Sequence, residues 1–468
     1  MRRPNILLLS TDQWRWDALG VNGNVDVQTP NLDRLAGEGT NFDHYFVQSP
    51  VCMPSRASFL SGQYPSTLRT THMGVPVPET TVTLPKLLRP YGYTSANIGK
   101  LHFLPHANRD HREPHPDYGF DHLEISDEPG CYEDAYRAWV RRKAPDQVDL
   151  ISVGLPPATE AWQRVLGVRD GIAHPAERFP LAAQPFRGRA DLTHTAFVAE
   201  QTIAFVDQQR HAPFLCIAGF YSPHSPWVAP QAFLDRYDPG GFTLPQFPAD
   251  VEAQRAAGRC SNAELRAARH GYYAMISEVD YHIGRVLAHL DARGLRDDTV
   301  VIFTSDHGEW LGEHLKYGKG YPAPDCVSRV PLLIRRPGAD TLPSATVSRI
   351  VEAVDVVPTL LDLAAIQRPA FLQGRPLPFD AVPDPVTASD TPSALTEGAG
   401  WKALRTPGFR YVAHADGREL LFDLANDPGE YQDVAGHSTD RDVLGEHRHL
   451  LLRRLLEMER PLPRTWSY

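Results

Sequence analysis

The stretch of sequence that decides the fold is Asn5-Ile6-Leu7-Leu8-Leu9-Ser10, followed directly by Thr11-Asp12-Gln13. Its apolar residues are continuous, which is typical of a parallel β-strand that helices cover on both faces. Ligands of parallel α/β sheets bind at the carboxyl ends of the strands. Asp12 comes just after this predicted strand and is therefore the first candidate site residue.

Further buried strands and helices follow along the chain. We predict strands over residues 94–98, 213–220 and 299–304, and helices over residues 30–38 and 193–209. Thr29 is the expected N-cap of the first helix, because Pro30 fits the first helical position. A third helix carries apolar residues on one face, from Met275 to Leu290. Alternating strands and helices predict the α/β class, with a large mixed, mostly parallel sheet sandwiched by helices.

The C-terminal tail has a different pattern. Short antiparallel strands are predicted over residues 409–412 and 419–424, and a closing helix over residues 446–457. Residues 370–394 are rich in Pro and Asp, so we interpret them as a join. The expected organisation is a catalytic α/β domain over residues 1–370 and a smaller α+β domain over residues 371–468. Residues 101–190 show no clear alternation of strand and helix.

The composition excludes several classes of protein. The 468 residues are 42% hydrophobic and 22% charged, as expected for a globular chain with one large and one smaller domain. A formal net charge of -10 disfavours nucleic-acid binding. No apolar run approaches the roughly 20 residues that span a membrane, and the run at residues 6–9 is too short for a secretion signal. The five scattered cysteines argue against a disulfide framework and indicate a cytoplasmic location.

Cys52-Met53-Pro54-Ser55-Arg56 is the most distinctive motif. Pro54 and Ser55 suit the first turn of a helix, so Cys52 is expected at or near a helix N-terminus, where an anion is favoured. Taken alone, a single Cys is usually a small core residue. A thiol nucleophile is the second interpretation, because a helix N-terminus would lower the pKa of the thiol.

Polar residues follow other predicted strands as well. His224 follows residues 213–220, and Asp306-His307 follow residues 299–304. Together with Asp12, the pair Asp306-His307 places two carboxylates and an imidazole at strand ends, which predicts a divalent-metal site. Each of these residues alone would more often be a hydrogen-bonded loop residue. A lone Lys100 or Lys319 would more often be a solvated charge, so the prediction depends on the whole set.

The pentapeptide around Cys52 resembles the modification motif of the type I sulfatases, in the alkaline phosphatase superfamily. Other segments resemble sulfatase motifs in the expected order: Ser10-Thr11-Asp12-Gln13, Gly99-Lys100-Leu101-His102, Pro223-His224-Ser225-Pro226, Ser305-Asp306-His307-Gly308-Glu309, Gly318-Lys319 and Leu421-Phe422-Asp423-Leu424. Roughly, the segment 105–190 lacks a match. The resemblance implies an alkaline-phosphatase-like fold with a small C-terminal α+β domain, and hydrolysis of sulfate esters.

The resemblance also implies a nucleophile and a metal ion. A formylglycine-generating enzyme would oxidise Cys52 to formylglycine (3-oxoalanine), whose hydrate attacks sulfur and gives a covalent sulfo-enzyme. Asp12, Asp306, His307 and the modified Cys52 would hold one divalent metal ion, which lowers the pKa of the attacking hydroxyl. Sulfatases often have a second Asp and a final Asn where this sequence has Gln13 and His307, so Ca²⁺ and Mn²⁺ both stay candidates. Gln13 would be a weak ligand or a hydrogen-bond donor beside the site.

Sulfate ester cleavage needs cations at the nonbridging oxygens and an acid at the leaving oxygen. By the resemblance, Arg56 and Lys100 steady the formylglycine, and Lys319 holds the sulfate. His224 would protonate the leaving oxygen. His102 would take a proton from the second hydroxyl of the diol, so that sulfate leaves without attack of water on sulfur. The expected substrate-binding residues are Gln13, Lys100, His224 and Lys319.

Three functions are compatible with this reading. The preferred one is hydrolysis of an aryl or other small organic sulfate monoester. The same site could hydrolyse a phosphonate monoester or phosphodiester, although Lys100 and His102 are more sulfatase-like. A non-catalytic binding protein would need Cys52 to stay unmodified. A homo-oligomer is also compatible with the sequence.

Two further sets of residues have structural and functional interpretations. The histidines that crowd the segment after His102 are His106, His111, His115 and His122. A second metal site is the alternative there, but the spacing fits no strong template, so we interpret the segment as a polar loop. The tryptophans beside the motifs are Trp14, Trp16, Trp227 and Trp310. Core packing is expected for each, and as a group they could line an apolar pocket for the leaving group.

Overall fold

The computed structural model describes residues 3–106, 111, 113–154, 164, 167, 171–175, 181–209, 212–256, 258–338, 344–379 and 392–459. Its main sheet is built from β1 (Asn5–Asp12), β2 (Thr40–Phe42), β4 (Thr94–Gly99), β5 (His122–Ile125), β7 (Phe214–Pro223), β9 (Thr299–Ser305), β10 (Leu332–Arg335) and β11 (Ala345–Val347). The strand order is β11-β2-β10-β9-β1-β7-β4-β5. β10 runs antiparallel to β9 and β2, and the other neighbours are parallel. The predicted mixed, mostly parallel sheet is confirmed.

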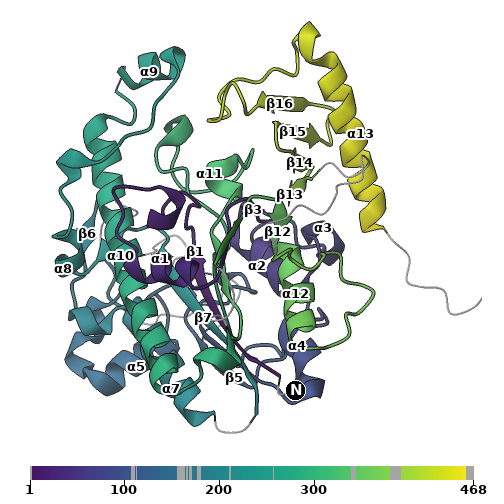
Figure 1. Ribbon diagram of the computed structural model, residues 1–468. Coiled ribbons are helices and arrows are strands. Elements are labelled where there is room, and N and C mark those ends of the chain that lie inside the picture. Colours follow the sequence, from purple (N-terminus) through teal and green to yellow (C-terminus); the bar gives the residue numbers. More distant parts are fainter. Residues whose placement is uncertain are drawn as a thin grey trace, which may run out of the picture.

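Helices cover both faces of this sheet (Figure 1). One face packs against α1 (Pro30–Gly37), α5 (Ala135–Lys143), α7 (His194–Gln208) and α10 (Asn262–Ala292). The other face packs against α2 (Cys52–Ser61), α4 (Leu84–Leu88) and α12 (Val356–Leu363). In β1, Leu7 and Leu9 belong to the first core, whereas Ile6 and Leu8 belong to the second. The continuous apolar run of β1 is explained by this alternation, because both of its faces are buried.

The smaller elements complete the chain. The remaining helices are α3 (Pro65–Leu68), α8 (Gln231–Leu234), α9 (Ala249–Ala256) and α11 (Asp325–Ser328). Two short parallel strand pairs join β3 (Tyr45–Phe46) to β12 (Val351–Glu352) and β6 (Gln184–Pro185) to β8 (Val228–Ala229). Among the described residues, the longest and most apolar helices still fall short of what is needed to cross a bilayer.

The predicted ends of the central strands and helices lie mostly within a few residues of the observed ends. β1 extends two residues beyond the predicted end, so Asp12 is its last residue rather than its successor. The third predicted helix is much longer than its apolar stretch, because Ser261 and Glu264 form a capping box at the start of α10. β5 and α5 lie in the segment that showed no alternation, and β5 is an edge strand whose first three residues are only half-buried.

Thr29 is the N-cap residue of α1, as predicted, and Pro30 is the first helical residue, but the side chain of Thr29 does not cap the helix. The Thr29 side chain makes no cap hydrogen bond; its Oγ1 accepts from Gly20 N at 2.9 Å instead. The carboxylate of Asp280 in α10 accepts from Leu32 N at 2.8 Å and from Asn31 N at 3.1 Å. A carboxylate from a distant helix therefore satisfies the free N–H groups at this helix start.

The C-terminal part forms a second, antiparallel sheet. Its strands are β13 (Ala394–Gly398), β14 (Trp401–Arg405), β15 (Phe409–His414) and β16 (Glu419–Asp423), paired in that order. The helix α13 (Arg441–Met458) packs on it through Leu444 and Leu451. Figure 1 shows this unit in yellow-green beside the main sheet. Residues 380–391 of the expected join lie outside the described residues, and the boundary at residue 370 stays a prediction.

Candidate active site

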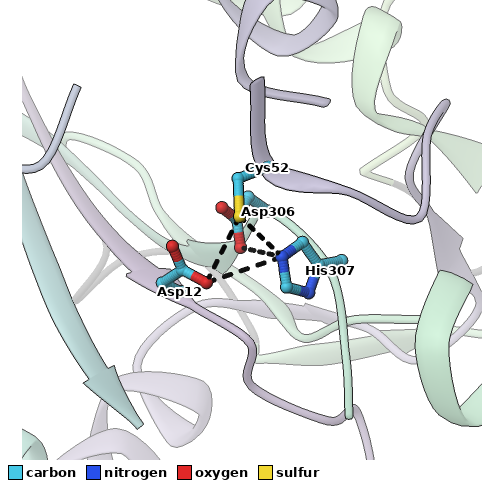
Figure 2. A group of neighbouring side chains, drawn as sticks. All are labelled: Asp12, Cys52, Asp306 and His307. Atoms are coloured by element: carbon cyan, nitrogen blue, oxygen red, sulfur yellow. Dashed lines mark hydrogen bonds and ion pairs between the residues drawn. The ribbon is translucent and has the colours of Figure 1, made fainter. Parts of the chain in front are cut away.

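Four candidate metal ligands meet at the carboxyl end of the main sheet (Figure 2). Asp12 ends β1, Asp306 and His307 follow β9, and Cys52 is the first residue of α2. One ligand atom from each of these buried residues lies within 4.8 Å of the others. His307 Nε2 is 3.5 Å from Asp12 Oδ1 and 3.6 Å from Asp306 Oδ1. The parallel strands β1 and β9 are adjacent, and this adjacency brings together residues nearly 300 positions apart.

The donor set fits a divalent cation. His307 Nδ1 lies 2.9 Å from Gly308 O, so as a donor it leaves Nε2 directed at the carboxylates. Burial lowers the pKa of His307 to about 4, so the imidazole is neutral, as a ligand must be. Burial opposes ionisation of Asp12, but Lys100 and other nearby cations hold its pKa well below the usual value.

Gln13 follows Asp12 and has a buried side-chain oxygen. Its Nε2 donates to Glu309, whereas its buried Oε1 has no hydrogen-bond partner among the described residues. Its backbone adopts a left-handed φ of 71°, and its N–H donates to Asp306 Oδ1 at 3.1 Å. A non-glycine residue in this conformation is uncommon and is held by its surroundings. An unpartnered buried amide oxygen is a suitable ligand for a hard cation.

The Cys52 thiol lies among groups of both charges. Its Sγ is 2.6 Å from Lys319 Nζ, 3.2 Å from His307 Nε2 and 3.8 Å from Asp12 Oδ1. Burial, and then the negative charge of Asp12, raise the thiol pKa to about 12. The lowered pKa expected from the helix N-terminus is therefore wrong, because desolvation outweighs it. At neutral pH the thiol stays protonated, which disfavours a thiolate nucleophile.

Arg56 and Lys100 hold the carboxylates in place. Arg56 Nε is 2.7 Å from Asp306 Oδ2, and its Nη2 is 3.4 Å from Asp12 Oδ2. Lys100 Nζ is 2.9 Å from Asp12 Oδ2. All four side chains are almost fully buried. These two cations therefore act on the carboxylates directly, and on residue 52 through them.

Lys319 and His224 form a pair on the other side of the thiol. Lys319 Nζ is 3.0 Å from His224 Nε2, and His224 Nδ1 is 2.5 Å from Ser225 O. Burial, and then Lys319, lower the pKa of His224 to about 3. Burial opposes the charge on Lys319, but nearby anions raise its pKa above the usual value. The ammonium of Lys319 thus donates to a neutral imidazole.

Among the described residues, His102 forms no hydrogen bond with this group, although the charges of Lys100, Arg56 and Asp12 act on its ring. Both of its ring nitrogens are buried without a hydrogen-bond partner among the described residues. Its ring stacks on His106 with centroids 4.1 Å apart. His106 is in turn 2.9 Å from Glu128 Oε1. The role of Glu128 was missed, because it lies in the segment without a motif and approaches the site only through the tertiary fold.

The motif tryptophans are mostly core residues. Trp14 and Trp227 are fully buried, and Trp310 is 1% exposed. Trp16 lies under the guanidinium of Arg329, with 3.6 Å between the guanidinium carbon and the ring centroid. Their burial favours core packing over an open pocket for the leaving group.

Comparisons with known proteins place the chain in a family. Residues 4–366 match the family model described as Sulfatase. The chain is 28% identical to an ulvan-active sulfatase of Formosa agariphila, over 97% of this chain and 82% of that protein. It is also 28% identical to an arylsulfatase of Clostridium perfringens, over 97% and 94%. The structure of the phosphonate monoester hydrolase of Agrobacterium radiobacter aligns with 97% of this chain and 96% of that one, with TM-score 0.79 and 27% identity.

Proposed function

The chain belongs to the sulfatase family of sulfuric ester hydrolases, and we propose that it hydrolyses aryl or other small organic sulfate monoesters through formylglycine at position 52. The observation that supports this most is the position of Cys52. It starts α2 inside the group of Asp12, Asp306 and His307, with Lys319 Nζ 2.6 Å from its sulfur. A thiol with a pKa of about 12 is a poor nucleophile there, whereas an aldehyde hydrate offers two hydroxyls on one carbon.

The proposed metal ligands are Asp12, Gln13, Asp306, His307 and residue 52. We propose Mn²⁺ or Ca²⁺, because the donors are mostly oxygens with one imidazole. When bound, the ion supplies positive charge and favours ionisation of a hydroxyl of residue 52. Arg56 and Lys100 keep Asp12 and Asp306 ionised and fix their orientation.

Lys319 and His224 are proposed to bind the ester. Lys319 Nζ contacts both Cys52 Sγ and His224 Nε2, so it can bind sulfate oxygens between the nucleophile and the acid. His224 needs a proton on Nε2 to protonate the leaving oxygen. The pKa of His224 is low in the absence of substrate. A negative charge beside the ring raises this pKa, and the bound sulfate brings that charge.

His102 is proposed to act in the second half of the reaction. After the sulfur–oxygen bond to the leaving group breaks, residue 52 carries the sulfate on one oxygen. His102 then takes the proton of the other hydroxyl, the carbonyl forms, and the carbon–oxygen bond to sulfate breaks. The aldehyde is regenerated without attack of water on sulfur. The unpartnered ring nitrogens of His102 suit a base that must accept and release a proton.

The phosphonate monoester and phosphodiester activity is the second candidate. It is favoured by the likeness to the Agrobacterium radiobacter phosphonate monoester hydrolase. Lys100 and His102 lie in a segment that resembles the sulfatase motif Gly-Lys-x-His, which we take as support for the sulfate ester. Rates on nitrophenyl sulfate and on a nitrophenyl phosphonate monoester, measured on one preparation, should favour the sulfate. A faster phosphonate reaction would reverse this order.

The decisive experiment compares specific activity with the formylglycine fraction of residue 52. Preparations made with and without a formylglycine-generating enzyme should give activity proportional to that fraction, measured by peptide mass spectrometry. Cys52→Ser should undergo one round of sulfation without turnover, because serine has a single hydroxyl. Cys52→Ala should do neither. Full activity in a preparation that contains only the thiol contradicts the proposal. A cytoplasmic location and maturation by that enzyme are part of the same proposal.

A further inference from the structure

Glu128 is a buried carboxylate that connects two residues behind the active site. Its Oε1 is 2.9 Å from His106 Nε2 and 3.8 Å from Lys100 Nζ. The side chains of Glu128 and His106 are 8% and 9% exposed, and that of Lys100 is fully buried. Burial opposes its ionisation, but Lys100 and His106 lower the pKa of Glu128 to about 2. Glu128 is therefore an anion that fixes the position of the His106 ring.

The His106 ring lies against the face of His102. The two ring centroids are 4.1 Å apart and the planes differ by 23°. The backbone of His102 is also fixed, because Asp127 Oδ1 accepts from Leu101 N and His102 N at 2.9 and 2.8 Å. The φ of His102 is 53°, a conformation that non-glycine residues adopt only when their surroundings impose it. Backbone and ring face are both held, while the ring nitrogens are not.

This arrangement lets the base use either ring nitrogen. A hydrogen bond to either nitrogen would orient the ring, but it would also occupy one site of proton exchange. Contact with the ring face orients the imidazole and leaves both nitrogens available. Burial, and then the neighbouring His106, lower the pKa of His102 well below its usual value, which keeps the ring in the neutral form.

We propose that His106, anchored by Glu128, is a positioning residue for His102, holding its imidazole through stacking so that a ring nitrogen faces the second hydroxyl of residue 52. The proposal rests on the sulfatase mechanism proposed above. It assigns a role to a histidine that the sequence placed in a polar loop.

Three variants test the proposal by kinetics. His106→Ala removes the stacked ring, whereas His106→Phe keeps a flat ring against His102. His122→Ala is the matched control, because His122 is a half-exposed histidine of the same segment, paired with Glu124. His106→Ala should lower kcat by about tenfold or more, since a misplaced catalytic group costs up to about a hundredfold, with KM changed by less than about twofold. The control should stay within about threefold of the parent. The Phe variant keeps a ring against His102 but loses the contact with Glu128, so its kcat should lie between those of the parent and His106→Ala.

Intact-mass analysis locates the affected step. Because His102 acts after sulfur transfer, His106→Ala should accumulate enzyme with sulfated residue 52, at unchanged metal content and formylglycine fraction. A parent-like kcat in His106→Ala, an equal loss in His106→Phe, or a loss without the sulfated species overturns the proposal. A merely structural role would lower folded protein or metal content, and would not select the second step.

A measurement without turnover separates this proposal from the proposed function. Histidines labelled at ¹³Cε1 report ring environment by NMR, and His102→Gln identifies the His102 resonance. His106→Ala should shift or broaden that resonance, whereas His122→Ala should leave it in place. An unmoved His102 resonance in His106→Ala overturns the positioning role even if the enzyme is a sulfatase. A modified parent enzyme that cleaves no sulfate ester contradicts the function instead, and the NMR result still decides the stacking.

Discussion

The molecule contains two buried groups of cations and carboxylates that differ in how completely they are paired. The first is the catalytic pocket around Cys52. The second, which we call the sheet joint, consists of Asp325, Arg405, Arg410 and Glu430, and it connects the C-terminal sheet to α11. In the joint, Arg405 Nε and Nη2 bind the two oxygens of Asp325 at 2.9 and 3.0 Å. Arg410 Nε is 2.5 Å from Glu430, and its Nη2 donates to Asp325.

The pocket has comparable burial but leaves polar groups without partners. Gln13 Oε1 and both His102 nitrogens have none among the described residues, and Lys319 donates to a thiol. In the joint, the corresponding exception is Arg410 Nη1. An unpartnered buried polar group costs roughly 1–3 kcal/mol, and in the pocket a bound ligand could satisfy these groups. The difference teaches that the pocket, unlike the joint, leaves several polar groups available to a ligand.

The largest expected effect comes from breaking the pocket at Asp306. Asp306→Ala removes a metal ligand, the acceptor of Gln13 N and the counterion of Arg56. Metal content measured by elemental analysis should fall to background, and kcat/KM for nitrophenyl sulfate should fall by at least about 10⁴-fold, since metal and positioned charge are lost together. Retained metal and activity would place the metal site elsewhere.

The second-largest expected effect tests whether His224, which is paired with Lys319, protonates the leaving oxygen. His224→Ala should lower kcat/KM by about 10² to 10⁴ for alkyl sulfates, which need an acid, and much less for nitrophenyl sulfate. A series of phenyl sulfates with leaving groups of different pKa should therefore give a steeper Brønsted slope in the variant. His270→Ala is a suitable control, because His270 lies on α10 with its Nε2 2.9 Å from Leu234 O. Equal losses across the series would remove His224 as the acid.

How far the sequence could predict the two groups depends on where their residues lie in the chain. The sequence predicted the four candidate metal ligands because each ends or follows a buried strand or starts a helix, within a short motif. These residues are Asp12, Cys52, Asp306 and His307. Glu128 could not be found, because its contact with Lys100 depends on how residues 101–190 fold over the sheet. The carboxylate that binds the N–H groups at the start of α1 was missed for a similar reason, since Asp280 is 248 residues from Leu32. The short edge strand β5 gave no signal because its first three residues are only half-buried.

The third effect breaks the joint instead of the pocket. Arg410→Ala leaves the buried Glu430 carboxylate without its cation, which should lower the free energy of unfolding by about 3–5 kcal/mol. Metal content and kcat per folded molecule should stay within about twofold of the parent, because Arg410 makes no recorded contact with the pocket. Urea unfolding and elemental analysis measure the two quantities.

Arg418→Ala is the matched control for the joint. Arg418 pairs with Asp416 on the surface, and the two side chains are 71% and 56% exposed. Removing this pair should change stability by less than about 1 kcal/mol. A loss of metal in Arg410→Ala, or equal destabilisation by the two variants, would show that the joint and the pocket are one coupled network.

The smallest effect concerns a buried carboxyl group that has neither a metal site nor an arginine. Glu278 in α10 is 1% exposed, and Thr193 Oγ1 donates to its Oε1 at 2.5 Å. Burial raises its pKa from 4.5 to about 8. The folded state therefore keeps a proton that the unfolded state releases above pH 4.5. The stability that this proton contributes is complete below pH 4.5 and is lost as the pH rises toward 8.

Glu278→Gln keeps the shape of the side chain and removes this titration. As the pH rises from 5 to 8, the parent should lose stability relative to the variant. The difference in their free energies of unfolding should change by about 1 kcal/mol per pH unit, since one pKa unit corresponds to about 1.4 kcal/mol. Urea unfolding at four pH values measures the difference, and Glu252→Gln on the surface of α9 should follow the parent throughout. Parallel curves for the parent and Glu278→Gln would mean that the folded protein holds an ionised carboxylate without a cation. An ionised buried carboxylate would then exist without a cation, so paired charges would not be a special feature of the joint. The joint and the pocket would then differ only in the unpartnered polar groups of the pocket.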